Sequence, residues 1–222
     1  MRRLLYDLAA DDETVRFSPY CWRTKLALAH KNLDYETVPW RFTDKEVIAF
    51  SGQDKVPVLV DGDQVITDSQ MIAEYLDETY TNEPPLYGDE PARALTNFVR
   101  SWTDRVLHPV LVQILVPDIF ARLAERDKQY FRATREARLR CTIEELAERR
   151  PGAIAAFQTA LAPLLATLGT QLFVSGEAPG YADHIVFGAL QWARLMSSTP
   201  LFDAGSPLGQ WMQAVLETYG LQ

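Results

Sequence analysis

A proline-rich segment near residue 85 constrains the fold of this chain most strongly. Residues 82–91 contain three prolines and one glycine, a composition typical of an exposed connection between folding units. The charge also changes there, because residues 1–83 carry 9 basic and 16 acidic side chains, whereas residues 84–222 carry 13 and 14. We therefore expect two domains, 1–82 and 92–222, joined by a linker at 83–91.

The first of these domains has a pattern of alternating strands and helices. An apolar run at 4–8, a helix at 19–30 and an extended segment at 35–38 predict a βαβ unit. A short helix, a hairpin around the turn Asp61-Gly62-Asp63 and a helix that begins after Asp68 predict a second unit. The order βαβ-αββα predicts one small mixed sheet.

Beyond residue 91 the periodic segments predict helices. Their apolar residues recur every three or four positions, which is the spacing of one helical face. The expected helices span 92–120, 128–148, 153–168, 182–196 and 208–219. Asp183, near the start of the fourth of them, is interpreted as a structural residue. The chain is therefore expected to join an α/β domain to an all-α helical bundle.

Ser18 and Pro19 form a turn that opens the predicted helix at 19–30. Proline suits the first helical position because no backbone N–H is needed there. The unpaired N–H groups at a helix start carry partial positive charge, which favours a thiolate over a thiol. Ser18 is therefore expected to donate its hydroxyl hydrogen to a sulfur, either that of Cys21 or that of a thiol cofactor.

The same helix is expected to bury one face on the sheet. Trp22, Leu26 and Ala29 form an apolar stripe at helical spacing. Arg23 and Lys25 lie off this stripe and are expected to stay in solvent.

Cys21 is a second candidate nucleophile. An ionised Cys21 could reduce mixed disulfides by thiol exchange. In turns of this kind the fourth position is usually more buried than the first, so a packed and inert Cys21 is favoured. Cys21 and Cys141 are the two cysteines of the chain. Their wide separation fits a reducing compartment such as the cytoplasm, without a disulfide framework.

Two further motifs indicate recognition of a peptide with an amino-acid head group. A cis bond at Val56-Pro57 would let Val56 offer its N–H and C=O to a peptide backbone, and a trans proline at a strand start is the alternative. Asp68 is suited to an α-ammonium and Ser69, at a helix start, to a carboxylate. One or both could instead only cap the helix. Lys55 is a second candidate to pair with a carboxylate, and the alternative is a solvated lysine.

In combination these motifs resemble those of the glutathione S-transferase superfamily, serine type. The resemblance implies glutathione as cosubstrate, no metal, and Ser18 as the catalytic residue that activates the glutathione thiol. It implies that Lys55-Val56-Pro57 and Asp68-Ser69 bind glutathione.

Four segments are more narrowly similar to the bacterial β-etherase-like branch, some of whose members cleave aryl ethers with glutathione. These segments are 5–8, 18–25, 72–77 and 130–135. The resemblance covers essentially the whole chain. It implies a thioredoxin-like first domain, an all-helical second domain and a cytoplasmic homodimer.

The expected activity is attack of the glutathione thiolate on a small hydrophobic electrophile, with aryl-ether cleavage as one form of it. The alternatives are an isomerase or dehalogenase of the same type, and a glutathione-binding protein without turnover. The electrophile is expected between the domains, against Tyr20, Trp102, His108, Ile114 and Phe120. The basic run at 122–140 predicts a solvated helix face, and the alternative is that one arginine meets an acidic substrate.

Other classes of partner are disfavoured. The formal net charge of −8 argues against electrostatic binding of nucleic acid or of an anionic membrane surface. The uncharged stretch at 151–176 predicts a buried amphipathic helix rather than a membrane span. His108 has no obvious carboxylate partner in the sequence, so neither a metal-binding nor a general-base role is expected for it.

Overall fold

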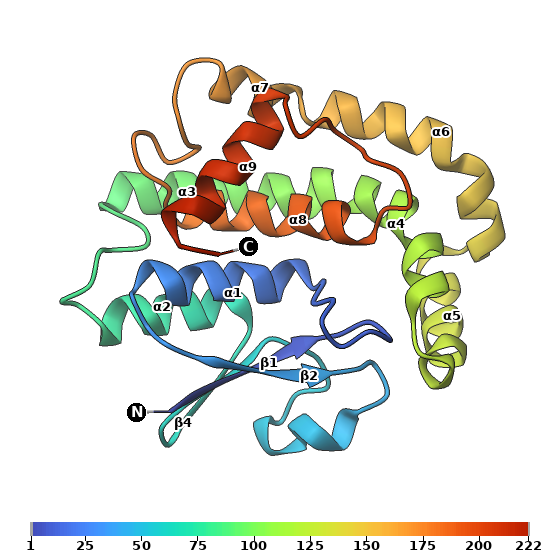
Figure 1. The fold of residues 1–222 in the computed structure, drawn as a ribbon, viewed down its shortest axis with the longest axis horizontal. Coiled ribbons are helices and arrows are strands. Elements are labelled where there is room, and N and C mark those ends of the chain that lie inside the picture. The colour runs from blue at the N-terminus through green and yellow to red at the C-terminus, as the bar shows by residue number, and fades with distance from the viewer. Residues whose placement is uncertain (1, 222) are drawn as a thin grey trace.

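The computed structural model describes residues 2–221 and stacks a small sheet, a pair of helices and a helical layer (Figure 1). The strands are β1 (Arg3–Leu8), β2 (Glu36–Trp40), β3 (Val58–Asp61) and β4 (Gln64–Thr67), in the order β2-β1-β3-β4. β1 pairs in parallel with β2 and antiparallel with β3, and β4 pairs antiparallel with β3. This arrangement confirms the predicted thioredoxin-like βαβ-αββα domain.

The helices α1 (Pro19–His30) and α2 (Ser69–Thr79) lie between the sheet and the helical layer (Figure 1). Leu5 and Leu59 of the sheet, Leu28 of α1 and Ile72 of α2 are completely buried in one cluster. Burying these side chains stabilises the first domain by roughly 1.5–3 kcal/mol each. The short helix η1 (Lys45–Ser51) leads from β2 towards β3.

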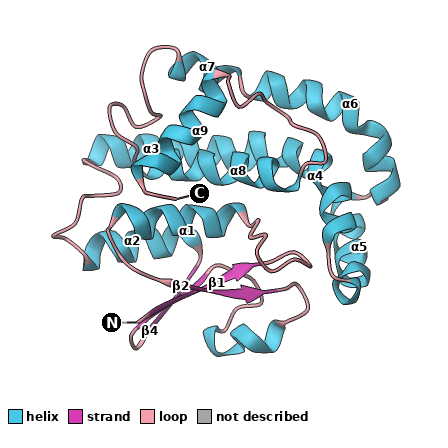
Figure 2. Ribbon diagram, in the orientation of Figure 1, coloured by secondary structure: helices cyan, strands magenta, loops and turns pink. Residues whose placement is uncertain are grey.

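The described residues beyond α2 form helices and loops (Figure 2). The helices are α3 (Glu90–Trp102), α4 (His108–Arg122), α5 (Glu125–Leu139), α6 (Ile143–Ala160), α7 (Ala162–Leu168), α8 (Tyr181–Met196) and α9 (Pro207–Thr218). The predicted all-helical second half is confirmed. Asp183 has the structural role expected of it, because its buried carboxylate accepts hydrogen bonds from the backbone N–H groups of Val174, Ser175 and Gly180.

Several predicted helix boundaries are wrong. The helix expected at 92–120 is interrupted by a π-helical turn, Thr103–Leu107, between α3 and α4. The helix expected at 128–148 ends at Leu139, because Arg140 adopts a left-handed backbone with φ 56°. A new helix, α6, then begins after Thr142.

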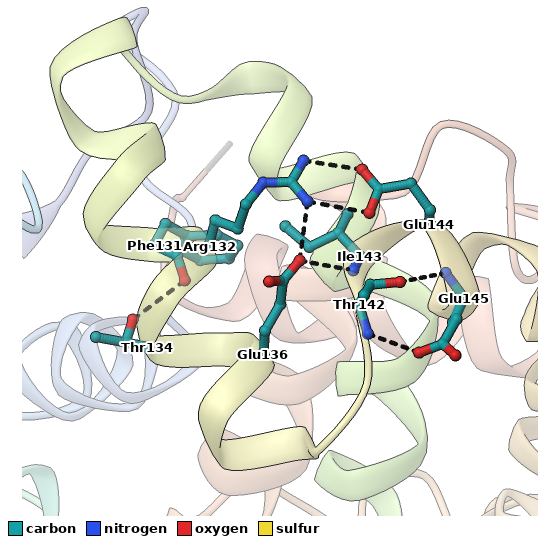
Figure 3. Close-up of polar contacts among 8 residues, drawn as sticks. All are labelled: Phe131, Arg132, Thr134, Glu136, Thr142, Ile143, Glu144 and Glu145. Carbon is teal, nitrogen blue, oxygen red and sulfur yellow. Dashed lines mark hydrogen bonds and ion pairs between the residues drawn. The ribbon is translucent and has the colours of Figure 1, made fainter.

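Thr142 and Glu145 explain this new start (Figure 3). The Glu145 backbone N–H donates to the Thr142 hydroxyl at 3.1 Å, and the Thr142 N–H donates to the Glu145 carboxylate at 2.8 Å. This reciprocal cap satisfies two backbone N–H groups that the helix leaves unpaired. The Thr-x-x-Glu pattern of this cap indicates a helix start, but the apolar periodicity of 128–148 favoured one continuous helix.

The stretch Ile143–Leu168 is long and apolar enough to cross a membrane by length and composition alone. In the structure it forms α6 and α7, with a turn at Leu161 between them. Phe157, Leu161 and Leu164 are buried in the helical core, as the amphipathic pattern predicted.

The proline-rich connection is less exposed than its composition suggested. Leu86 and Tyr87 are buried, which corrects the expectation of an exposed segment. The Leu86 N–H donates to the Asp77 carboxylate at 2.8 Å, and its carbonyl accepts from the Tyr181 N–H at 2.8 Å. The connection is therefore fastened to both α2 and α8. The domain limits of 82 and 92 stay predictions.

The expectation that Arg23 and Lys25 stay in solvent is wrong. Both are buried. Arg23 lies beside Gly188 of α8, which covers this face of α1, whereas Lys25 reaches Asp7 of β1. Arg23 pairs with Asp104 at 2.7 Å and Lys25 pairs with Asp7 at 2.5 Å. Trp22 packs on Phe187 of α8, with ring centroids 5.9 Å apart, rather than on the sheet alone.

Candidate functional site

A pocket of about 810 Å³ opens between the first domain and the helical layer. From the first domain it is lined by Ser18, Tyr20, Lys55 and Val56, among others. His108 of α4 and Trp192 of α8 line it from the helical half. Of the residues expected to wall the pocket, Tyr20 and His108 do so, whereas Trp102, Ile114 and Phe120 are not among the lining residues.

Ser18 is the N-cap of α1 and forms part of the pocket wall. Its Oγ accepts a hydrogen bond from the Cys21 N–H at 3.2 Å, and its carbonyl accepts one from the Trp22 N–H at 3.0 Å. The side chain is only 4% exposed, so these contacts fix its position. Because Oγ accepts in this cap, its own hydrogen is left to be donated. Ser18 thus presents a donor next to the positive end of a helix.

Cys21 lies one turn further along α1, away from the pocket. It is fully buried and is not a lining residue, as the packed alternative predicted. Burial, together with the nearby Asp7 carboxylate, raises the pKa of the Cys21 thiol well above its ordinary value. Its thiolate is therefore disfavoured. The group of this turn that lines the pocket is the Ser18 hydroxyl, at the first position.

Val56 and Pro57 precede β3 and are joined by a cis peptide bond. Within residues 2–221 neither the N–H nor the C=O of Val56 makes a hydrogen bond with another backbone group. Lys55 and Val56 line the pocket, whereas Pro57 is buried behind them. The arrangement leaves a stretch of unpaired backbone in the wall of the pocket that Ser18 also lines.

Asp68 and Ser69 lie at the start of α2 and are not lining residues of the pocket. The Asp68 carboxylate accepts from the N–H groups of Gln70 at 2.8 Å and Met71 at 3.4 Å. Asp68 is therefore a helix cap, which is the structural alternative left open by the sequence. Its φ of 69° is unusual for a residue with a side chain. Ser69 is buried, and its carbonyl accepts from the Tyr181 hydroxyl at 2.8 Å.

His108, Tyr20 and Asp104 form a polar cluster in the pocket wall, between α1 and the helical half of the chain. The sequence did not predict this cluster. His108 Nδ1 lies 3.3 Å from the Tyr20 hydroxyl and 3.6 Å from the Asp104 carboxylate. This corrects the expectation that His108 has no carboxylate partner, although the i, i+4 spacing to Asp104 was a readable signal. Burial and the nearby Arg23 lower the pKa of His108 to about 3. The imidazole is therefore neutral at physiological pH.

The two halves of the chain match family models for glutathione S-transferases. The N-terminal domain model matches residues 14–84 and the C-terminal domain model matches residues 94–201. Glutathione S-transferase U2 of Arabidopsis thaliana is 31% identical over 111 residues, which cover 46% of this chain and 49% of that protein. Glutathione S-transferase Z1 of the same plant is 42% identical over 78 residues, which cover 33% and 35%. The chain thus spans about half or less of the length of these curated relatives.

Solved structures share the whole fold. Glutathione transferase GSTFuA3 from Phanerochaete chrysosporium superposes with a TM-score of 0.87 and 25% identity, over 99% of this chain and 97% of that one. The glutathione S-transferase CsGST83044 of Ceriporiopsis subvermispora, solved in complex with glutathione, gives a TM-score of 0.86 and 24% identity over 99% and 98%. Because both halves match in order and the fold is shared throughout, the chain belongs to the glutathione S-transferase family.

Proposed function

We propose that this chain is a serine-type glutathione transferase, in which Ser18 activates the glutathione thiol for attack on a small hydrophobic electrophile. The observation that carries the proposal is the contrast between Ser18 and Cys21. Ser18 lines the pocket at the start of α1, whereas Cys21 is buried and disfavoured as a thiolate. The accessible group at this turn is therefore a hydrogen-bond donor rather than a nucleophile.

The energy that Ser18 must supply is modest. A free thiol has a pKa of about 8.5, so only a few per cent is ionised at neutral pH. Lowering that pKa by about two units requires roughly 2.7 kcal/mol of preferential interaction with the thiolate. A hydrogen bond to a charged group contributes about 1.5–3 kcal/mol and a helix start contributes about 0.3–1 kcal/mol. Together they reach the required value.

The neighbouring backbone is suited to hold the tripeptide. The N–H and C=O of Val56 have no backbone partner within residues 2–221, so a bound peptide can pair with both as a strand would. Lys55 offers a cation to a carboxylate. Asp68 and Ser69 would receive the γ-glutamyl head group, and for Asp68 this adds to its role as a cap.

The electrophile would lie between the two halves, against aromatic rings such as Trp40 at the end of β2, Phe42 just after it and Tyr130 of α5. This wall suits a flat aromatic substrate. As the specific reaction we propose aryl-ether cleavage. The thiolate sulfur bonds to the ether carbon, and the phenolate leaves with the electron pair of the broken C–O bond.

The test compares Ser18→Ala with Cys21→Ala on a panel of aryl ethers, aryl halides and epoxides, with glutathione adducts detected by mass spectrometry. We expect Ser18→Ala to lower kcat/KM about 100-fold, which corresponds to about 2.7 kcal/mol of lost transition-state stabilisation. Cys21→Ala should retain activity within about threefold, because its thiol does not reach the pocket.

The opposite ranking of the two variants would overturn the serine assignment. Halide release without glutathione consumption, or isomer formation, would select the dehalogenase or isomerase alternative. Retention on a glutathione column without turnover of any panel member would select the glutathione-binding alternative.

We also propose a homodimer that uses α3. Leu95 and Phe98 lie one turn apart on this helix and are 67% and 72% exposed. Neighbouring exposed apolar side chains of this kind are typical of a protein–protein interface. Phe98→Glu should yield a monomer in sedimentation velocity, whereas the equally exposed Leu172→Glu should not. A wild-type monomer at micromolar concentration would contradict this proposal.

A further inference from the structure

The pocket is far more basic than the chain. The whole sequence has a net charge of −8, yet five basic residues line the pocket and only two acidic residues do. The basic residues are Lys45, Lys55, Arg135, Arg138 and Arg149. Both acidic residues already have cationic neighbours, because Asp104 pairs with Arg23 at 2.7 Å and Asp54 lies 3.8 Å from Lys45. The pocket therefore has an excess of positive charge for an anionic ligand.

Arg135 is the most distinctive of these cations. Its guanidinium carbon lies 4.8 Å from the centre of the Phe42 ring and 4.5 Å from that of Phe131. Its one hydrogen bond within residues 2–221 goes to the Thr134 hydroxyl at 2.9 Å. Burial and the neighbouring Arg138 lower the pKa of Arg135 to about 10, so it still carries its charge at neutral pH.

Arg135 is the less exposed of the two α5 arginines, Arg135 and Arg138, that line the pocket without a carboxylate partner among the described residues. Within the described part of the chain, Arg135 takes part in no ion pair, whereas Arg126 on the same helix pairs with Asp44 at 2.8 Å. Arg150 on α6 pairs with Asp118 at 2.6 Å. A partly buried guanidinium without a carboxylate is costly. An anionic ligand group in the pocket would offset that cost.

Polar contacts of Arg132 and Glu136 hold the end of α5 against the start of α6 (Figure 3). Arg132 bridges Glu136 at 2.8 Å and Glu144 at 2.9 Å. Glu136 in turn accepts from the Ile143 N–H at 3.2 Å. Arg132 thus ties α5 to α6, while Arg135, one turn further on, faces the pocket.

We propose that the electrophile carries a carboxylate that pairs with Arg135 while its aromatic ring lies against the rings beside that guanidinium. This inference rests on the proposed function and adds a substrate class to it, namely aryl electrophiles with an acid group. An arginine presents a planar pair of donors that matches a carboxylate. The glycyl carboxylate of glutathione is the other possible source of this chemistry, and Lys55, next to Val56, is better placed for it.

The test uses two aryl halides that differ only in charge, 4-chloro-3-nitrobenzoate and 4-chloro-3-nitrobenzamide. In both, the glutathione sulfur bonds to the ring carbon, chloride leaves with the bonding pair, and the thiol proton passes to solvent. Kinetics are measured for the wild type, Arg135→Met, Arg135→Lys and the control Arg126→Met.

We expect Arg135→Met to lower kcat/KM at least about tenfold for the benzoate and less than about twofold for the benzamide, as loss of one charge-assisted bond predicts. Arg135→Lys should recover part of the loss, and Arg126→Met should behave as wild type. Equal losses on both substrates, or no loss, would overturn the proposal. A higher KM for glutathione with either electrophile would assign Arg135 to the tripeptide and would also overturn it.

A binding measurement separates this inference from the proposed function. Unreactive 4-methyl-3-nitrobenzoate should quench the fluorescence of Trp40 and Trp192, which line the pocket. Its dissociation constant should rise about tenfold in Arg135→Met, while that of the matching benzamide stays constant. If the wild type turns over neither these halides nor any member of the electrophile panel, the proposed function fails, and this pair of dissociation constants alone decides whether the carboxylate site exists.

Discussion

Gly188 is the residue that lets α8 lie against the first turn of α1. A Cβ atom at this position would stand 2.3 Å from the carbonyl oxygen of Pro19, closer than atoms can approach without displacement. Pro19 follows Ser18 directly, so the position of the proposed catalytic hydroxyl depends on a glycine 170 residues further along the chain.

Gly188→Ala should lower the free energy of unfolding by about 1–3 kcal/mol, the usual cost of an inserted methyl group in a packed contact. The matched control is Gly152→Ala on α6, where nothing lies within 4 Å of the new Cβ. That change should raise stability by about 0.5–1 kcal/mol, because alanine favours helices over glycine. Urea unfolding measures both. Similar effects at the two positions would contradict the close contact.

At the scale of single residues, the sequence correctly predicted the roles that depend on neighbouring residues in the chain. Ser18 and Asp68 could be recognised as helix starts from their neighbours alone. Arg23 could not be placed correctly, because Asp104 and α8, which lie around it, are far away in the chain. The carboxylate partner of His108 is only four residues away, whereas the Tyr20 hydroxyl that it also contacts lies on α1. One helix's periodicity tells which residues share a face, but not which partner later covers the opposite face.

At the scale of elements, two histidines tie the end of the last helix to α1 of the first domain and to α8. The Tyr219 hydroxyl, just beyond α9, lies 2.8 Å from His30 Nδ1 of α1 and 2.8 Å from His184 Nε2 of α8. Burial lowers the pKa of His30 and lowers that of His184 well below its ordinary value. His108 is lowered as well, so all three histidines of the chain favour the neutral form.

Stability should therefore fall in mild acid. Below the unfolded-state pKa of about 6.5 the unfolded chain binds protons that the folded chain excludes, so the free energy of unfolding decreases as the pH falls. Each histidine contributes up to about 1.4 kcal/mol per pH unit. Urea unfolding between about pH 7.5 and 5.5 checks this, and His184→Asn should reduce the slope. An unchanged stability over this range would contradict the buried neutral histidines.

At the boundary between α5 and α6, two sequence patterns predict different structures. The apolar periodicity of 128–148 continues through the turn at Arg140, so periodicity alone merged α5 with α6. The local cap at Thr142 and Glu145 decides the structure instead. The turn between α5 and α6 sets the position of Arg135. Because the basic run at 122–140 does not reveal this turn, the sequence predicted a solvated helix face there. Only the folded structure shows that Arg135 and Arg138 of this run line the pocket, whereas Arg126 and Arg132 form ion pairs.

At the scale of the whole molecule, the order of strands and helices was sufficient to predict both halves of the fold. It could not predict the pocket, whose wall combines residues from β1, β2, α1, α4, α5, α6 and α8 with η1, the π-helical turn and the loops between them. The contact between the halves includes an ion pair, in which the buried Arg23 of α1 meets Asp104 of the turn between α3 and α4. Such a pair depends on tertiary packing, for which a single sequence gives no direct signal.

The most direct test of the account is the ionisation of glutathione in this pocket. The ultraviolet absorbance of the thiolate is titrated with pH in the presence of saturating protein, with S-methylglutathione as the blank. We predict that the bound thiol titrates about two units below the value of about 8.5 for a free thiol, and that Ser18→Ala returns the midpoint towards the free value. A bound thiol that titrates like free glutathione in the wild type, or a midpoint unchanged by Ser18→Ala, would contradict the role of Ser18.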